Sequence, residues 1–415
     1  MDIIPLAKPY LGDKEAEAAG EAIRSGWVTQ GKRVEAFEEA FASYVGSKYA
    51  CAVSNCTNAL HLSLLVVGVK PGDVVITVSH SFIATANSVR CCMAEPVFVD
   101  IDLQTYNICP QQLNKLLEDS CEIKNGILYY KDTARLTCGE SPLVYIDEHR
   151  RGRVAAIIAV HQLGMPCDLS SIINIAQEYN LPVIEDAACA LGSEIYINDQ
   201  WEKIGKPHGD VACFSFHPRK MITTGDGGMI TTSRDEHYHK FKLLRNQGMS
   251  MSASERRDSR EVVVEKYLVT AFNSRLTDIQ AAVGIIQLQQ LDMFIEKRQN
   301  VNQLYRQYFK DINWLSLPYE PEYAHTNWQT YPVRVLKNAP FLRDDLIQHL
   351  FDNDIASIPG VMNAHQTKPY DQQNCSLPNS ECARKEVIML PFYVDLNEND
   401  VKRIADVLAQ IETKV

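Results

Sequence analysis

The chain has 415 residues, of which 46% are hydrophobic and 22% are charged, and its formal net charge is −11 at pH 7. This composition is typical of a soluble globular protein with one large domain and a smaller one. No apolar run approaches the roughly 20 residues that a membrane-spanning helix needs. The N-terminus lacks the cationic start and apolar core of a secretory signal. We therefore expect a cytoplasmic protein with no membrane partner.

The distribution of basic residues argues against a nucleic-acid-binding protein, and the distribution of cysteines argues against a disulfide-bonded or metal-binding one. The basic clusters are short, at residues 148–153 and 254–260, whereas a nucleic-acid-binding surface shows a basic patch or stripe. The twelve cysteines are scattered, with no C-x-x-C pair and no zinc-ligand spacing. In a reducing compartment this pattern predicts free thiols. We expect no nucleic-acid partner, no structural disulfide and no metal site.

Helices and short apolar strands alternate along the first 285 residues. Helices are predicted at 14–24 and 34–45, after Ser54, and at 81–94 and 168–180. Strands are predicted at 72–77, 95–102, 154–161, 182–188 and 210–216. Several of these strands are apolar at nearly every position, which suits a largely parallel sheet covered on both faces. The pattern predicts an α/β fold.

The domain organisation follows from where this alternation breaks. Residues 118–153 contain two polar turns and short β-like runs, which predict a hairpin-like insertion in a large domain of residues 1–285. Residues 272–309 predict a long, kinked helix that leaves this domain. Short strands and helices in residues 286–415 predict a smaller α/β C-terminal domain. The insertion itself points to no function.

Two segments carry polar residues where a sheet protein binds ligands. "SNCTNALHL" (54–62) places small polar residues at a helix N-terminus, where free N–H groups favour a phosphate. A routine helix cap by Ser54, Asn55 or Thr57 explains the same residues. "VIEDAACALGS" (183–193) ends an apolar strand at Asp186. Ligands bind beyond the carboxyl ends of strands in open α/β sheets. Taken alone, a solvated Asp that caps the next helix explains Asp186 as well.

A third segment, "FSFHPRKMITTGDGG" (214–228), holds Lys220 between an apolar strand and a glycine-rich turn. A lysine nucleophile must spend time unprotonated, which burial or a nearby cation such as Arg219 can arrange. The glycines allow close backbone approach to a ligand. Taken alone, Lys220 is more simply a surface cation. The combination of a phosphate-binding helix start, an Asp at one strand end and a lysine at another is the set that pyridoxal phosphate requires.

These segments, with "AFNSRLTDIQAAVG" (271–284), resemble the DegT/StrS-type nucleotide-sugar aminotransferases of the fold-type I superfamily. The resemblance covers nearly the whole chain and includes "GWVTQGKRVEAFEEAFASYVG", "AVHQLGMPCDL" and "GVMNAHQTKPY". It implies a large, mostly parallel-sheet domain that binds pyridoxal 5′-phosphate and a smaller C-terminal domain. It also implies a homodimer with shared active sites.

The resemblance assigns roles residue by residue. Lys220 is expected to form the Schiff base with the cofactor and to move protons, and Asp186 to pair with the ring nitrogen. Phe82 matches the residue that stacks on the ring, and Cys189 stands where the family usually has Gln or His. A thiol is a weak donor, so Cys189 departs from the family at that contact. The other implied residues are Thr57, Asn58, Ala59 and Ser215 at the phosphate, Asn273 from the partner subunit, and Thr29, His217 and His365 at the substrate.

The implied reaction is transfer of an amino group from L-glutamate to a keto-deoxy sugar linked to a nucleotide, with pyridoxamine phosphate as the cofactor form between the two half-reactions. The sequence around Lys220 is more similar to the sequences of members that act on 4-keto-6-deoxy sugars than to those of members that act on 3-keto sugars. Amino sugars of this kind serve surface polysaccharide, including lipopolysaccharide and O-antigen. Three alternatives stay open: a 3-keto sugar aminotransferase, a sugar dehydratase, which Lys220 disfavours because dehydratases carry histidine there, and a non-enzymatic protein with the same fold.

Overall fold

The computed structural model describes residues 3–251 and 264–411. Its centre is a seven-stranded sheet in the order β1-β11-β10-β7-β6-β2-β3. The strands are β1 Tyr49–Val53, β2 Val74–Val78, β3 Glu95–Val99, β6 Val154–Val160, β7 Val183–Asp186, β10 Val211–Ser215 and β11 Gly228–Thr232. Every residue of β2, β3, β6, β7 and β11 is buried, as expected for a sheet covered on both faces. The basic cluster at 254–260 lies outside the described residues.

The sheet is mixed, because β11 runs antiparallel to both of its neighbours, β1 and β10, whereas β10, β7, β6, β2 and β3 are parallel. The sequence analysis placed no strand at either β1 or β11. Both sequences, YACAV and GMITT, are short, and β11 directly follows the glycine turn that the sequence analysis assigned to a loop. The α/β fold with a mostly parallel sheet is confirmed.

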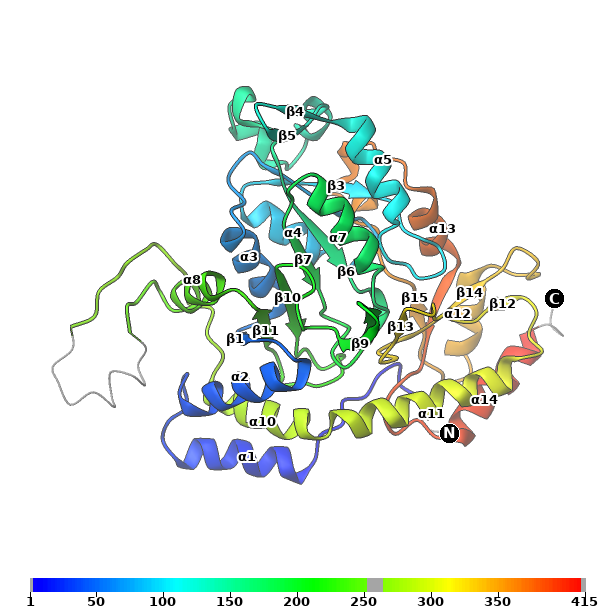
Figure 1. Ribbon diagram of the computed structural model, residues 1–415. Coiled ribbons are helices and arrows are strands. Elements are labelled where there is room, and N and C mark those ends of the chain that lie inside the picture. Colours follow the sequence, from blue (N-terminus) through cyan, green and yellow to red (C-terminus); the bar gives the residue numbers. More distant parts are fainter. Residues whose placement is uncertain (1–2, 252–263, 412–415) are drawn as a thin grey trace.

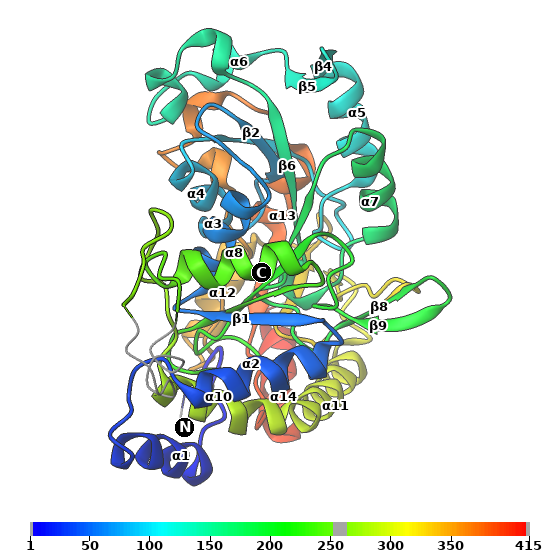
Figure 2. The ribbon, with the colours of Figure 1, turned by 60° about the vertical axis from the view of Figure 1, so that its left-hand side comes forward.

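Helices cover both faces of the sheet (Figures 1 and 2). In Figure 2, β1 lies between α8 on one side and α2 on the other. The helix α3 packs against β7, β10 and β11, and α7 packs against β6. The helices of this part are α1 Asp13–Arg24, α2 Lys32–Val45, α3 Cys56–Val66, α4 Ala84–Cys91, α5 Pro110–Ser120, α7 Leu169–Glu178, α8 Asp235–Arg245 and α10 Asp278–Gln289.

The residues of the predicted insertion form a hairpin and short helical turns at the end of the molecule farthest from α1 (Figure 2). Strands β4 Cys121–Lys124 and β5 Ile127–Tyr130 pair antiparallel. Asn125 and Gly126 join them with positive φ angles of 52° and 76°, the geometry that an Asn-Gly hairpin turn requires. Short helical turns follow, at α6 Thr133–Leu136, η1 Pro142–Tyr145 and η2 Glu148–Arg150.

The long helix predicted for residues 272–309 is two helices. Thr277 caps the start of α10 with a capping box, and the chain bends at Gln290 before α11 Leu291–Phe309. Figure 1 shows α11 running from α10 below the large sheet to α14 at the C-terminal end. The helix therefore connects the two parts of the molecule.

The C-terminal part has its own apolar core, formed mainly by residues 301–411 and joined by Ile4. Its sheet has the order β12-β14-β16-β15. Residues 364–377, however, pack against Ala86 and Phe98 of the large part, so the C-terminal residues are not a fully separate body. The elements are β12 Leu315–Ser316, β14 Tyr331–Val335, α12 Arg343–Phe351, β15 Ile358–Pro359, η4 Ala364–Gln366, η5 Asp371–Gln373, α13 Pro378–Glu386, β16 Val387–Leu390 and α14 Glu398–Ile411.

A small third sheet, in the order β13-β8-β9, joins the two parts. Its strands are β8 Glu194–Ile197, β9 Gln200–Lys203 and β13 Ala324–His325. All twelve cysteines are free. Among the described residues, no helix is long and apolar enough to cross a membrane, and no group of His, Cys, Asp and Glu has the arrangement of a metal site.

Candidate functional site

A cavity of about 790 Å³ opens at the carboxyl ends of β6, β7 and β10, beside the first turn of α3. This is the edge of an open α/β sheet where ligands bind. The cavity brings together eight residues that the sequence analysis singled out, namely Thr57, Asn58, Phe82, Asp186, Cys189, Ser215, His217 and Lys220. Residues separated by up to 163 positions in the sequence thus share one site.

The first turn of α3 lies at the cavity wall because the backbone of β11 comes very close to it. A Cβ atom on Gly228 would lie 2.6 Å from the carbonyl carbon of Asn55, so only glycine allows this approach. The Asn55 side chain caps the helix by accepting the amide of Asn58 at 2.9 Å. Thr57 lies in the first turn of α3, where backbone amides have no partner within the helix. The turn therefore offers donors to a phosphate.

The predicted cradle is smaller than the sequence analysis expected. Ala59 is fully buried within α3, and its amide donates to the carbonyl oxygen of Asn55 at 3.1 Å. Ala59 does not line the cavity, whereas Thr57 and Asn58 do. The amide of Asn58, like that of Ala59, is already used, because it donates to the Asn55 side chain. The expectation for Ala59 came from its place in the motif, which does not show which amides the helix itself consumes.

Asp186 ends β7 as a buried carboxylate at the cavity wall. One oxygen accepts the Thr85 hydroxyl at 2.8 Å, and the other accepts the Ala188 amide at 3.2 Å. Burial raises the pKa of Asp186, and the two hydrogen bonds offset part of this effect. Among the described residues, no cation forms an ion pair with this carboxylate. A positive group that enters the cavity would supply the missing partner.

Lys220 lies in the turn that follows β10, and its amide donates to the carbonyl of His217 at 2.8 Å. Its ε-amino group donates to the sulfur of Cys189 at 3.1 Å. Burial lowers the pKa of Lys220, but the facing Cys189 and Cys56 thiols and the carboxylate of Asp186 outweigh burial and raise the pKa. Of the two ways of lowering this pKa that the sequence analysis considered, burial acts in the structure, whereas Arg219 is not among the main groups that shift it.

Two aromatic groups lie at the mouth of the cavity. Phe82 is 66% exposed although it lines the cavity, so its ring is free to cover a flat ligand. His217 is exposed beside Lys220. Burial, with the positive charges of Arg219 and Lys220, lowers the pKa of His217. Ser215, at the end of β10, also lines the cavity.

Besides Ala59, three predicted residues lie away from the cavity lining. Thr29 lies outside the cavity lining, and its carbonyl oxygen accepts a hydrogen bond from the amide of Asp278 at 3.2 Å. Asn273 is exposed and accepts the Nε–H of Arg275 at 3.0 Å. His365 is buried and lies 2.6 Å from the Ser79 hydroxyl, with Nδ1 as the contacting atom. His365 thus joins the C-terminal part to the end of β2 rather than facing the cavity.

Several cavity residues were not predicted. His161, Gln162, Gln329 and Arg384 line the cavity, as does Arg219, which the sequence analysis named only as a cation near Lys220. Gln329 donates to the carbonyl oxygen of Arg219 at 2.7 Å, which ties the C-terminal part to the lysine turn. The motif "AVHQLGMPCDL" was noticed for its resemblance, but nothing in the sequence shows that His161 reaches the site. No sequence signal distinguishes Gln329 or Arg384 from surface residues.

The residues present fit pyridoxal phosphate. Asp186 offers the ring nitrogen a buried anion that has no ion-pair partner within residues 3–251 and 264–411, and the first turn of α3 offers donors to the phosphate. Lys220 offers the amine, and all three line one cavity. Phe82 would cover the ring.

A sequence profile of the DegT/DnrJ/EryC1/StrS aminotransferase family matches residues 9–409. The chain belongs to this family. It is 34% identical over 411 residues to the GDP-perosamine synthase of Caulobacter vibrioides, covering 98% of each protein. It superposes on S. venezuelae DesV with a TM-score of 0.82 at 25% identity, covering 100% of both chains. It also superposes on Helicobacter pylori PseC, an aminotransferase involved in the biosynthesis of pseudoaminic acid, with a TM-score of 0.80 at 26% identity, covering 99% of this chain and 100% of that chain.

These likenesses establish the fold and the reaction class. The structure is that of a fold-type I sugar aminotransferase, and the family's aminotransferases use pyridoxal phosphate. The chain is therefore a transaminase.

Proposed function

We propose that this aminotransferase transfers the amino group of L-glutamate to a keto-deoxy sugar linked to a nucleoside diphosphate, with a 4-keto-6-deoxyhexose as the acceptor. The observation that carries the proposal is the meeting of Lys220, Asp186 and the first turn of α3 in one cavity that also holds two arginines. The product would serve surface polysaccharide biosynthesis in the cytoplasm. A GDP-perosamine synthase and an aminotransferase involved in the biosynthesis of pseudoaminic acid are among the proteins that this chain resembles.

The arginines suit an anionic acceptor. Arg384 lines the cavity and donates to the carbonyl oxygen of Gly360 at 2.6 Å, and Arg219 lines it from the lysine turn. Within the described ranges, neither guanidinium forms an ion pair with a carboxylate. Burial and the neighbouring Arg343 lower the pKa of Arg384. A diphosphate would compensate both charges.

The roles of this chain's residues follow from their positions. When bound, pyridoxal phosphate supplies an electron sink that stabilises negative charge next to the reacting carbon. Asp186 would hold the ring nitrogen through an ion pair that the buried carboxylate otherwise lacks. Lys220 would hold the cofactor covalently and, once released, move a proton to or from the reacting carbon. Thr57 and Asn58 would orient the phosphate.

The acceptor is tested by incubating the purified protein with L-glutamate and a panel of keto sugar nucleotides that carry the carbonyl at C-3 or C-4. Mass spectrometry would detect the aminated product, and NMR would assign the carbon. We expect amination at C-4. Amination at C-3 alone would replace the proposed acceptor with a 3-keto sugar. Loss of a sugar hydroxyl without nitrogen transfer from labelled glutamate would indicate a dehydratase instead.

We further propose that the active unit is a homodimer in which Asn273 completes the partner's site. Asn273 is exposed and outside its own cavity lining, next to Phe272 and near Tyr267, which are 39% and 68% exposed. The neighbouring Ser274 carbonyl accepts the amide of Ser54, so Asn273 also lies beside its own helix α3. The test must therefore separate the two subunits.

Mixing inactive variants separates them. If Asn273 serves the partner, a hybrid of K220A and N273A subunits contains one site with both native residues. Mixing then restores activity, because each hybrid dimer has one native site and random exchange makes about half of the dimers hybrid. If Asn273 serves its own subunit, both sites of the hybrid stay damaged. Unchanged inactivity after subunit exchange, verified by mass, would reject the shared site.

A further inference from the structure

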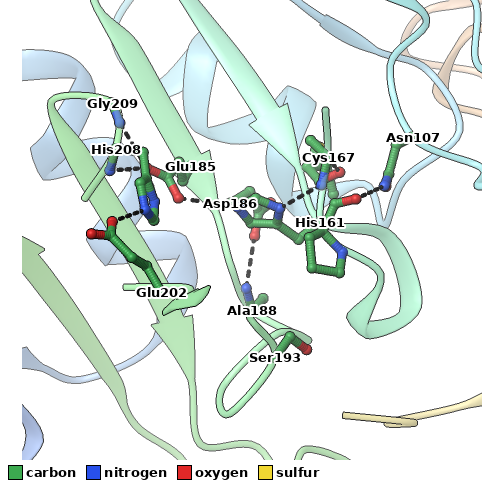
Figure 3. Close-up of polar contacts among 12 residues, drawn as sticks. Asn107, His161, Cys167, Glu185, Asp186, Ala188, Ser193, Glu202, His208 and Gly209 are labelled. Carbon is green, nitrogen blue, oxygen red and sulfur yellow. Dashed lines mark hydrogen bonds and ion pairs between the residues drawn. The ribbon is translucent and has the colours of Figure 1, made fainter. Parts of the chain in front are cut away.

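Behind Asp186 lies a buried chain of polar contacts that the proposed roles do not use (Figure 3). Nε2 of His161 lies 3.2 Å from one carboxylate oxygen of Glu185, and both side chains are fully buried. The other oxygen of Glu185 accepts the amides of His208 and Gly209, each at 2.8 Å. Nε2 of His208 in turn lies 2.8 Å from Glu202.

The hydrogen bonds fix which nitrogen of His161 carries a proton. Nδ1 of His161 accepts the backbone amide of Cys167 at 3.0 Å, so this nitrogen holds no proton. Nε2 therefore carries the proton and donates it to Glu185. A proton added at Nδ1 would face the N–H of Cys167. The imidazole is thus held in its neutral form at the cavity wall.

Glu185 is ionised in this arrangement. Burial acts to raise the pKa of Glu185, but the hydrogen bond from His161 and the charge at His208 outweigh it and lower the pKa. Its carboxylate has three donors, from His161 and the two backbone amides. A buried carboxylate with this number of donors is held in one position.

The pair is directly linked to Asp186 through the backbone. Glu185 precedes Asp186 on β7, and the amide of His161 donates to the carbonyl oxygen of Asp186 at 3.0 Å. The pair therefore joins the ends of β6 and β7 at the backbone of Asp186, and His161 itself lines the cavity into which the Asp186 carboxylate faces. A histidine that became charged here would also compete with the ring nitrogen for Asp186.

We propose that Glu185 and His161 are a positioning pair for Asp186. They fix the strand ends that carry Asp186, keep a neutral imidazole beside it, and thereby favour the protonated ring nitrogen of the bound cofactor. The inference rests on the family's use of pyridoxal phosphate and is independent of which sugar the enzyme aminates.

The variant E185Q tests the pair. Its amide oxygen can accept the two backbone amides, but its NH2 group then faces the Nε2–H of His161, donor against donor. The matched control is E202Q, which changes the contact to His208 and leaves the Glu185–His161 contact in place. The readouts are the dissociation constant of pyridoxal phosphate from a titration, and the ¹⁵N chemical shift of ring-labelled cofactor, which reports protonation of its nitrogen.

We expect E185Q to weaken cofactor binding by about tenfold or more and to leave the ring nitrogen partly deprotonated, whereas E202Q stays within about twofold of the native protein. If E185Q does not accumulate as folded protein, H161N takes its place, because Glu185 then keeps its two backbone donors. Native affinity together with a fully protonated ring nitrogen in the folded variant would overturn the inference. Neither readout needs a sugar, so failure of the proposed sugar reaction leaves the measurement intact.

Discussion

The ε-amino nitrogen of Lys220 lies 3.1 Å from the sulfur of Cys189, so this thiol is a hydrogen-bond partner of the reactive amine. Burial lowers the pKa of Lys220, but Cys189 contributes most to the opposing effect that raises it. An amine attacks a carbonyl only in its unprotonated form. The residue that departs from the usual family pattern therefore also influences how readily Lys220 loses its proton.

Replacing Cys189 with alanine should lower the pKa of Lys220, because the largest contribution that raises it disappears. The apo-protein should then combine with pyridoxal phosphate faster at pH 7 to 8, and the pH at which the rate is half-maximal should fall. Stopped-flow absorbance over a pH series measures both. The exposed Cys91 provides the matched control, since C91A should leave the profile unchanged. An unshifted profile in C189A would show that the contact does not influence the amine.

Restoring glutamine at Cys189 is a separate prediction about turnover. A glutamine amide is a stronger donor than a thiol toward the ring oxygen of the cofactor. We expect C189Q to transaminate faster than the native protein, by about a few-fold, the effect of one added hydrogen bond. Steady-state kinetics with a sugar that the native protein aminates measures the difference. Equal rates would show that the thiol costs the reaction nothing.

Replacing Arg384 with methionine tests how the acceptor is held. Methionine keeps an unbranched apolar stem and removes the charge, and a hydrogen bond to a charged group contributes about 1.5–3 kcal/mol. We expect the KM for the sugar nucleotide to rise by about tenfold or more and the KM for L-glutamate to stay near its native value. K385M, at the exposed neighbouring position, is the control. A selective rise in the KM for glutamate would assign Arg384 to the amino donor.

The site residues that could be predicted from the sequence are those whose motif lies within one continuous segment. The start of α3, the end of β7 at Asp186 and the lysine turn each combine a predicted element with a chemical group at its end. Arg384 contacts Gly360, and Gln329 contacts the lysine turn. The sequence around each of these residues does not show which residue it will contact. Such contacts depend on how the C-terminal part packs on the sheet.

The strand β11 shows a different limit. β11 follows the glycine turn directly, and glycine-rich sequence predicts a loop. The strand forms because β1 and β10 lie on either side and supply its hydrogen-bond partners. Tertiary pairing thus overrides the local preference. The place where this prediction failed is also where Gly228 lets the backbone approach the cofactor site.

Replacing Gly228 with alanine should therefore disturb cofactor binding. The added Cβ would lie 2.6 Å from the Asn55 carbonyl carbon and 2.9 Å from the amide nitrogen of Cys56, so the first turn of α3 must move. Overpacking of this kind costs about 1–3 kcal/mol. We expect weaker binding of pyridoxal phosphate and a lower melting temperature. In the control G20A, the new Cβ meets only the flexible end of Arg24, so cofactor binding should stay native.

His80 should make the stability of the protein depend on pH. The side chain is 1% exposed, and Nδ1 lies 2.7 Å from the Asn363 oxygen. Burial lowers the pKa of His80 to about 4, with a further lowering from Arg384 and His365, while Asn363 and Asp100 act to raise it. Because the unfolded chain binds the proton at a pH where the folded chain does not, stability is complete above pH 6.5 and is lost as the pH falls toward 4.

Between pH 7 and pH 5 this single group should reduce the free energy of unfolding by about 2 kcal/mol. The variant H80Q removes the titrating group and can still donate to Asn363, so its stability should fall by about that much less over the same interval. Urea unfolding at the two pH values measures the difference for each protein. H149Q, at an exposed position, should keep the native pH dependence. Equal losses in H80Q and the native protein would show that His80 binds its proton as readily in the folded state as in the unfolded chain.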